Sequence, residues 1–335
     1  MVSMNYLLRI AKGASFKKMG EAIDKVHEKC GKWKPLIFLD MVWCIVAYGA
    51  GYWDYLMFGF WDMTPAQKNT YLTRVRNKKV QTLMNDDAYS NEFDNKNIFN
   101  KRFARFLHRE TLDAENCTFE EFQQFIQGKE VVFAKANKGS CGQGIEKLRP
   151  ADFANTEAMW AYVQEKGFGV LEELVVQHPD MAALHPASVN TMRIVTDVVG
   201  DQVHIAYIVV KMGNGAFVDN SGQGGILCAV DPATGKITSP ATDDFTEHVY
   251  EQHPVTGVSF RGYQLPMVQE AIALVKEAAL EVPQIHHVGW DVAIGVDGPL
   301  IIEGNDYPGT DLCQLWPHTP NKTGLWPYYR RILGC

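Results

Sequence analysis

The sequence has no Cys-x-x-Cys pair, and its seven cysteines lie far apart along 335 residues. An odd number of widely scattered cysteines predicts neither a disulfide framework nor a zinc site. We therefore expect the chain to work in the reducing cytoplasm.

An excess of positive charge is also missing. The 32 Lys and Arg residues are outnumbered by 39 Asp and Glu, which gives a net charge of −7 at pH 7. This balance argues against nucleic acid, and against anionic lipid, as a general partner of the whole protein. The hydrophobic content of 46% is enough for a large core and predicts two or three lobes.

No apolar run is long enough to cross a bilayer. The stretch 36–61 is apolar and aromatic, with thirteen uncharged residues between Asp40 and Asp54, but a transmembrane helix needs roughly twenty. The first thirty residues carry scattered charges and no apolar centre, so no signal peptide is expected. We expect a buried helix followed by an aromatic turn. The alternative is a docking face for a partner or for the inner face of a membrane, which would make the protein peripheral to that membrane.

A Walker A loop is absent too, although one stretch has some of its features. The β-prone run 131–135 ends in a lysine and enters a glycine-rich turn without the Gly-Lys-Ser/Thr signature. Bare backbone N–H groups in such a turn can surround phosphate oxygens, and the lysine adds a point charge. A plain hairpin turn is the alternative. The residues expected to bind phosphate are Lys135, Gly139, Ser140, Gly142 and Gly144.

Two apolar runs near the C-terminal end, 287–294 and 300–305, are joined by Gly-Val-Asp-Gly and predict a β-hairpin. The hairpin would present Asp291, Glu303 and Asn305 together, since residues two apart on a strand share a face. Hard oxygen ligands without His or Cys suit Mg²⁺ that bridges nucleotide phosphates. The sequence therefore predicts these three residues as metal ligands and ATP as the nucleotide.

These elements, in this order, resemble the ATP-grasp superfamily. The segments 172–175 and 190–193 lie between the glycine-rich turn and the acidic hairpin, and the pattern from 177 to 196 is most similar to the sugar-transfer-associated ATP-grasp family. The resemblance implies an α+β fold in which two α+β lobes clamp ATP beside a mainly helical N-terminal lobe. The expected lobes are 1–92 (helical), 93–176 (small lobe with a glycine-rich lid) and 177–335 (large lobe with the metal and acceptor sites).

The resemblance also implies roles for further residues. Lys101 takes the place of a second nucleotide lysine, with Lys96 as a competitor and a solvated helix lysine as the plain alternative. The hinge that meets adenine and ribose is expected at Glu172, Glu173 and Leu174, and which glutamate points inward stays open.

Two basic strand residues are predicted to act on the transferring phosphoryl group. Arg193 is expected in mid-strand, where a charge is costly to bury without a partner, and its planar donors match a phosphate. Lys211 repeats this pattern on the next strand. The predicted catalytic residues are Arg193, Lys211 and Asn305.

The resemblance implies an ATP- and Mg²⁺-dependent ligase that forms an amide or related bond through an acylphosphate. Its partners would be a small carboxylate and an amine or sugar, as precursors of a surface polysaccharide, and it could associate peripherally with a membrane complex that assembles the glycan. Two alternatives stay open: a kinase that phosphorylates a hydroxyl, and a non-catalytic ATP-binding scaffold. Arg261 and Arg330 are the candidates for an acceptor-side basic cluster. The oligomeric state is also open, with a homodimer as one alternative.

Overall fold

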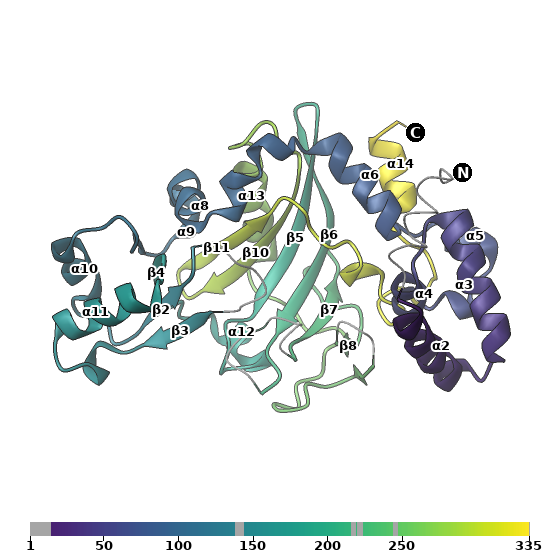
Figure 1. Cartoon of the computed structure of the whole chain (residues 1–335), viewed down its shortest axis with the longest axis horizontal. Coiled ribbons are helices and arrows are strands. Elements are labelled where there is room, and N and C mark those ends of the chain that lie inside the picture. Colours follow the sequence, from purple (N-terminus) through teal and green to yellow (C-terminus); the bar gives the residue numbers. More distant parts are fainter. Residues whose placement is uncertain (1–14, 138–143, 216–218, 220–223, 244–246, 335) are drawn as a thin grey trace.

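The computed structural model describes residues 15–137, 144–215, 219, 224–243 and 247–334. Two antiparallel sheets and a helical region follow one another along the long axis of the molecule (Figure 1). The α+β class expected from the sequence is confirmed. The three predicted lobe boundaries stay predictions. Helix α14 near the C-terminal end packs against α6 and also contacts the large sheet, where the Tyr328 hydroxyl donates to Asp197 at 2.8 Å.

The smaller sheet has four strands in the order β1-β4-β2-β3. Its strands are β1 (Thr111–Asp113), β2 (Val132–Lys135), β3 (Ile145–Leu148) and β4 (Val170–Glu173). Helices α10 (Phe119–Ile126) and α11 (Thr156–Lys166) cover one face, where Val132, Ala134 and Leu171 form part of the core. Strand alternation then places Lys135 and Glu172 on the opposite face, which the helices α10 and α11 do not cover and which is nevertheless buried at Val170 and Glu172.

The larger sheet has seven strands in the order β11-β10-β5-β6-β7-β8-β9. Its strands are β5 (Thr191–Val199), β6 (Gln202–Met212), β7 (Ile226–Val230), β8 (Ala241–Thr242), β9 (Val249–Tyr250), β10 (His287–Gly295) and β11 (Gly298–Asn305). One face packs on a mostly helical layer in the largest core cluster, around Trp290. That layer contains α7 (Asn91–Asp94), α8 (Lys96–Arg102), α9 (Ala104–Leu107), α12 (Pro179–Leu184) and α13 (Val268–Ala278).

The opposite face of the large sheet meets the N-terminal helices. Val195, Tyr207, Val209 and Leu227 pack against apolar side chains of those helices. The helices of this region are α2 (Phe16–Cys30), α3 (Lys34–Tyr48), α4 (Tyr52–Phe58), α5 (Pro65–Lys68) and α6 (Arg74–Met84), joined at the C-terminal end by α14 (Trp326–Ile332). Short 3₁₀ turns lie at Phe60–Asp62, Asp87–Tyr89, Pro150–Asp152 and Leu312–Gln314. The helices cover only part of this sheet face, and the uncovered part is polar.

Thr64 followed by Pro65 is the sequence pattern of a helix N-cap and first turn, and it predicts one helix through Val75; the structure corrects this prediction. Thr64 does cap a helix, with Gln67 completing a capping box, but α5 ends at Lys68 and α6 begins at Arg74. The break arises because the C-terminal segment holds the chain between them: Leu72 N donates to Gln314 Oε1 at 2.9 Å and the Tyr71 hydroxyl to Thr319 at 2.9 Å. Tertiary contacts therefore override the local helix signal.

The expectation of a buried apolar helix is also only partly right. Helix α3 buries Ile37, Met41 and Cys44 but exposes most of its other large apolar side chains. Among the described residues, no single helix has the length and apolar character needed to cross a membrane. The pair α3 and α4 meets that test only in combination, and the two are bent by 101°.

Candidate functional site

A row of charged side chains crosses three neighbouring strands on the polar part of the large sheet. Arg193 on β5 lies directly opposite Asp291 on β10, and Asp291 lies opposite Glu303 on β11. Directly paired residues project from the same face, so the register brings together three residues that are far apart in sequence. Arg193 holds Asp291 with two bonds, Nε to Oδ1 at 2.6 Å and an Nη to Oδ2 at 2.9 Å. Lys211 Nζ reaches Oδ2 at 2.8 Å.

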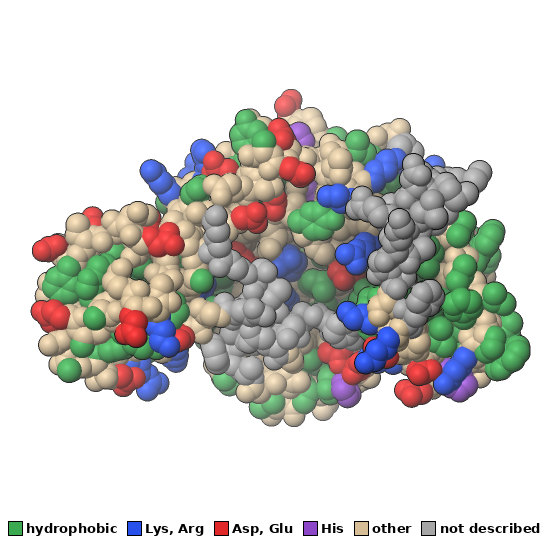
Figure 2. Space-filling model, in the orientation of Figure 1, with side chains coloured by type: hydrophobic (Ala, Val, Ile, Leu, Met, Phe, Trp, Pro, Cys, Tyr) green, Lys and Arg blue, Asp and Glu red, His purple; other side chains and the backbone are tan. Residues whose placement is uncertain are grey.

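Figure 2 shows Lys and Arg side chains at the bottom of a hollow over the centre of the molecule. Burial alone would raise the pKa of Asp291, but Arg193 and Lys211 hold that pKa well below its usual range. Desolvation of the carboxyl by the protein around it raises the pKa of Glu303, and the charge of Asp291 raises it further. Glu303 remains open to solvent, and no ion pair to it is recorded among the described residues. The row therefore carries one carboxylate, Asp291, that is paired with two cations, and a second, Glu303, that has no recorded ion pair among the described residues.

The residues of this row fit a bound Mg²⁺. Asn305 lies two residues beyond Glu303 on the same strand, so both side chains project from one face and the amide oxygen of Asn305 is available as a third ligand. The two facing carboxylates and the amide lie on the neighbouring strands β10 and β11 and offer hard oxygen ligands to a divalent cation. Such a cation would relieve the repulsion between the two carboxylates. Asp291 already accepts three bonds from cations, so Glu303 is the more open ligand. The three-residue metal assignment stays a prediction.

The face of the small sheet opposite α10 and α11 carries a second cluster of charged side chains. Lys135 Nζ lies 2.6 Å and Arg109 Nη2 lies 3.2 Å from the same oxygen of the buried Glu172. Burial would raise the pKa of Glu172, but Arg109 and Lys135 lower it to about 2. Glu172 is thus the glutamate that points inward, a choice that the sequence left open.

The other two predicted hinge residues lie at the edge of this cluster. Glu173 accepts a bond from Glu110 N at 3.1 Å, and Leu174 follows β4 directly and is exposed. Of the predicted phosphate-binding turn, Gly139, Ser140 and Gly142 lie outside the described residues. Gly144 is described, and it occupies a left-handed turn (φ 70°) just before β3. A role for any of these residues in nucleotide binding stays a prediction.

Arg109 is a residue that the sequence reasoning missed. It is buried, and besides Glu172 it donates to the carbonyl oxygens of Ile301 at 2.5 Å and Ile302 at 3.2 Å on β11. One guanidinium therefore connects the inward glutamate of the small sheet with the strand that carries Glu303. Nothing in the local sequence Leu-His-Arg-Glu distinguishes this arginine from a surface residue.

Lys96 is better placed than Lys101 to be a second nucleotide lysine. Its backbone N–H donates to Asn137 O at 3.2 Å, which ties the start of α8 to the end of β2. Burial lowers the pKa of Lys96, while Glu303 and Glu172 act against that shift and Lys135 adds to it. Lys96 thus lies within electrostatic reach of both charged clusters. Lys101 is exposed, and no recorded contact of the described residues joins it to them.

The two lysines make a matched pair for mutagenesis. We expect Lys96→Ala and Lys135→Ala each to weaken ATP binding about tenfold or more, because each removes a charge-assisted contact worth roughly 1.5–3 kcal/mol. Lys101→Ala, on the same helix, should leave ATP affinity within about twofold. Isothermal titration with a non-hydrolysable ATP analogue measures all three. An equal loss of ATP affinity in Lys96→Ala and Lys101→Ala would contradict the assignment of Lys96 to the nucleotide site.

Gly289 makes room for the Arg193 side chain. A Cβ at this position would meet Pro308 Cβ at 2.8 Å and Arg193 Cδ at 3.1 Å. The residue lies in the middle of β10, so an alanine there keeps the strand but pushes the guanidinium.

We therefore expect Gly289→Ala to lower turnover about tenfold or more, since small displacements of a positioned group are costly. ATP affinity should change little, because Lys135 and Lys96 are untouched. Gly20→Ala, where a Cβ meets nothing within 4 Å, is the control. Unchanged turnover in Gly289→Ala would show that Arg193 can shift without consequence.

The segment 177–190 has a structural part in the site. Asn190 Nδ2 donates to Met181 O at 2.8 Å and His185 O at 2.9 Å, and its backbone N–H donates to Gln177 Oε1 at 2.7 Å. These bonds fix the chain just before β5, one residue ahead of Thr191. Thr191 in turn donates its N–H to Asp219 at 3.0 Å, beside Lys211. The segment 177–190 therefore fixes the position of β5, the strand that carries Arg193.

Comparisons with known proteins agree with this geometry at the level of the family. A family model described as sugar-transfer associated ATP-grasp matches residues 75–332. No curated protein matches the chain.

Several solved structures are similar at low identity. An ADP complex of N5-carboxyaminoimidazole ribonucleotide synthetase is 12% identical (TM-score 0.39) and covers 66% of this chain and 46% of its own. D-alanyl-alanine synthetase A from Vibrio cholerae is 12% identical (TM-score 0.43) and covers 74% of this chain and 66% of its own. D-alanine-D-alanine ligase from Helicobacter pylori is 10% identical (TM-score 0.40), with 74% and 63% covered. The chain thus spans about half of the first of these proteins and just under two thirds of the other two.

Proposed function

We propose, because this chain belongs to the sugar-transfer-associated ATP-grasp family, that it is an ATP- and Mg²⁺-dependent ligase that joins a carboxylate to an amine. Two charged groups of side chains carry this proposal. One is the row Arg193–Asp291–Glu303 on the large sheet, and the other is the cluster Lys135–Glu172–Arg109 on the small sheet. Arg109 connects them, because it contacts Glu172 and also donates to Ile301 O on β11. Positive donors line both sides of this site, and a triphosphate is the ligand that they suit.

In the proposed reaction, a carboxylate oxygen of the substrate attacks the γ-phosphorus of ATP and ADP leaves. The amine nitrogen then attacks the acyl carbon, the C–O bond to phosphate breaks, and the nitrogen loses a proton. Arg193 and Lys211 are positioned to stabilise charge on the transferring phosphoryl group. Mg²⁺, held by Glu303, Asn305 and Asp291, would neutralise the triphosphate. Asp291 keeps the two basic side chains oriented.

The acceptor is proposed to lie between α6 and the loop that follows β11. Asn77 and Gln81 donate to Pro308 O, each at 3.4 Å, while Asn77 Oδ1 and Gln81 Oε1 are buried without a partner in the described residues. Buried acceptor atoms of this kind favour a ligand rich in N–H or O–H donors. An amino acid or a sugar precursor of a surface polysaccharide has this chemistry.

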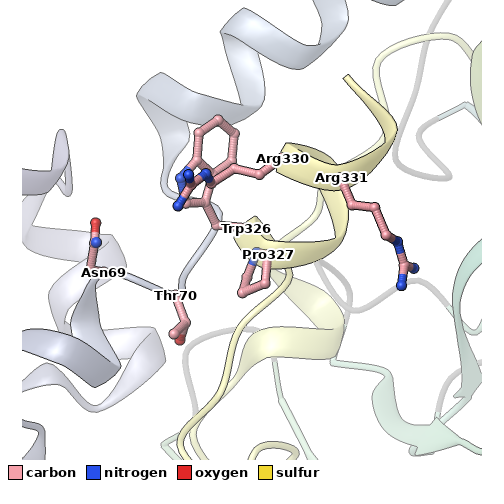
Figure 3. A pocket seen from close by; sticks show the side chains of 6 residues that line it. All are labelled: Asn69, Thr70, Trp326, Pro327, Arg330 and Arg331. Carbon is pink, nitrogen blue, oxygen red and sulfur yellow. The ribbon is translucent and has the colours of Figure 1, made fainter. Parts of the chain in front are cut away.

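The two arginines suggested as an acceptor-side cluster lie elsewhere. Arg261 is paired with Glu251 at 3.2 Å, and both side chains are half exposed. Arg330 lines a cavity of about 370 Å³ together with Asn69, Thr70 and Trp326 (Figure 3), and no residue of the charged row lines it. We therefore place the substrate contacts on α6 and on the loop 306–311 instead.

Trapping with hydroxylamine tests the proposed intermediate. The purified protein, Mg-ATP and a panel of amino acids and sugar acids are incubated with hydroxylamine, which converts an acylphosphate to a hydroxamate. We expect a hydroxamate that depends on both ATP and one carboxylate. ATP turnover with a phosphorylated hydroxyl product and no hydroxamate would replace the ligase with the kinase. ATP binding without turnover across the whole panel would favour a scaffold.

We also propose a cytoplasmic location. The five described cysteines, Cys30, Cys44, Cys117, Cys228 and Cys313, are all free thiols, which suits a reducing compartment.

A further inference from the structure

Helix α3 and the residue before it carry a contiguous exposed apolar surface, which we call the α3 face. Its members are Trp33, Leu36, Phe38, Leu39, Val42, Trp43 and Val46. They make up seven of the sixteen exposed large hydrophobic side chains among the described residues, within fourteen consecutive positions. Figure 2 shows this apolar surface at the end of the molecule where Figure 1 labels α3. A patch of this kind marks an interaction site rather than ordinary surface variation.

The α3 face is held in place by the protein beneath it. Ile37, Met41 and Cys44 are buried in the core that α3 shares with α2 and α4. The one acid of the helix, Asp40, turns inward to Lys68 Nζ at 2.7 Å and the Tyr55 hydroxyl at 2.7 Å. The only charged side chain between Lys34 and Tyr48 is therefore already paired within the protein.

The geometry favours a helix that lies along a surface. Fifteen residues of α-helix span about 22 Å, which is short of the roughly 30 Å of a hydrocarbon core. The chain then bends by 101° into α4, which returns Tyr55, Leu56 and Phe58 to the protein core. The partner is therefore a broad apolar layer that meets one side of the helix.

Charge identifies that layer. The described residues 15–34 contain six lysines and three Asp or Glu, in a protein whose net charge is −7. Lys32 and Lys34, both exposed, flank the exposed Trp33 at the start of the helix. Lys34 pairs with Asp24 at 2.8 Å and Lys32 donates to Trp61 O, but the Lys34–Asp24 pair is half exposed, so solvent screening leaves it weak and a headgroup phosphate can compete for the lysine. Tryptophan between lysines is suited to the headgroup level of a membrane, and each basic residue near an anionic surface contributes about 1 kcal/mol. The overall negative charge argues against general binding to lipid, whereas the segment 15–34 carries an excess of three positive charges beside the α3 face.

We propose that the α3 face docks on an anionic lipid surface. The apolar side chains enter the boundary of the acyl chains, and Lys32 and Lys34 meet the headgroups. A second copy of this chain is the less suitable occupant, because a symmetric contact would bring two basic rims together. The small sheet lies at the opposite end of the molecule from α3 (Figure 1), so docking leaves the nucleotide site open.

Flotation with lipid vesicles tests this proposal. The full chain is mixed with vesicles of phosphatidylcholine alone or with 30% phosphatidylglycerol. We expect Leu39→Asp to lower the partition into anionic vesicles about tenfold or more, because it removes an apolar contact and adds a like charge. Leu280→Asp is the matched control, since both leucines are exposed, at 61% and 53%. It should bind as wild type does. Lys32→Gln combined with Lys34→Gln should reduce the preference for the anionic vesicles.

Three results would overturn the proposal. The first is equal vesicle binding by Leu39→Asp and wild type, and the second is equal binding of wild type to neutral and anionic vesicles. The third is no vesicle binding at all, together with a dimer in light scattering that Leu39→Asp dissociates. That third result would assign the face to a second copy. Unfolding curves of each variant confirm that a loss of binding is not a loss of fold.

Discussion

Arg193→Met is expected to abolish turnover and to lower the free energy of unfolding by about 3–5 kcal/mol, the range for breaking one side of a buried ion pair. Asp291 loses two of its three charge-assisted hydrogen bonds and stays buried with Lys211 alone. Methionine keeps the apolar stem of the side chain, so the effect comes from the lost guanidinium and not from a cavity. Urea unfolding and ADP release measure the two consequences.

Arg261→Met is the matched control for this substitution. Arg261 pairs with Glu251 at the surface, where an ion pair contributes about 0–1 kcal/mol. A double-mutant cycle with Asp291→Asn isolates the pair: the stability losses of the two single variants should sum to more than the loss in the double variant, because either change alone already breaks the same ion pair. Wild-type stability in Arg193→Met would show that the pair with Asp291 is not formed in solution.

Glu303→Gln is expected to reduce turnover about 10³-fold or more while the protein still unfolds cooperatively. The change is nearly isosteric, and it removes the one carboxylate of the row that has no recorded ion pair in the described chain. If Glu303 holds Mg²⁺, the enhancement of ATP binding by Mg²⁺ should fall as well. Calorimetric titration of ATP with and without Mg²⁺ measures this directly and does not depend on activity.

The same substitution has a stability effect with a defined pH dependence. The folded-state pKa of Glu303 is raised, so the wild-type protein loses stability as pH rises through that pKa. Glu303→Gln removes this loss and should be the more stable protein at neutral pH, with the difference shrinking below the unfolded pKa near 4.5. Glu165→Gln, at an exposed glutamate of α11, is the control. Full turnover of Glu303→Gln in Mg²⁺ would contradict the metal assignment.

The acidic hairpin was predictable because its signals are local. Two apolar runs with a four-residue turn define β10 and β11, and strand alternation places Glu303 and Asn305 on one face. Arg193, predicted in mid-strand, does lie within the strand Thr191–Val199. The pairing of Asp291 with Arg193 required the order of strands in the sheet, which periodicity does not determine.

The rest of the site depends on tertiary contacts. Lys96 and Lys101 lie on one short helix, and only the bond from Lys96 N to Asn137 O shows which end of it meets the small sheet. Arg109 has no pattern around it and acts through carbonyl groups of a strand almost 200 residues away. Likewise, the apolar composition of α3 predicted a helix but not which of its faces lacks a partner within the protein.

The most direct test of the ligase is the separate quantification of ADP and free phosphate released from Mg-ATP. Amino acids are combined with sugar acids in pairs, and each is also supplied alone. We expect ADP and phosphate in equal amounts whenever a productive carboxylate and amine are present, whether one amino acid supplies both groups or a pair of substrates shares them, and no sustained release with a sugar acid alone. ADP without free phosphate would contradict the account, because the phosphoryl group would then remain on a product and the enzyme would be a kinase.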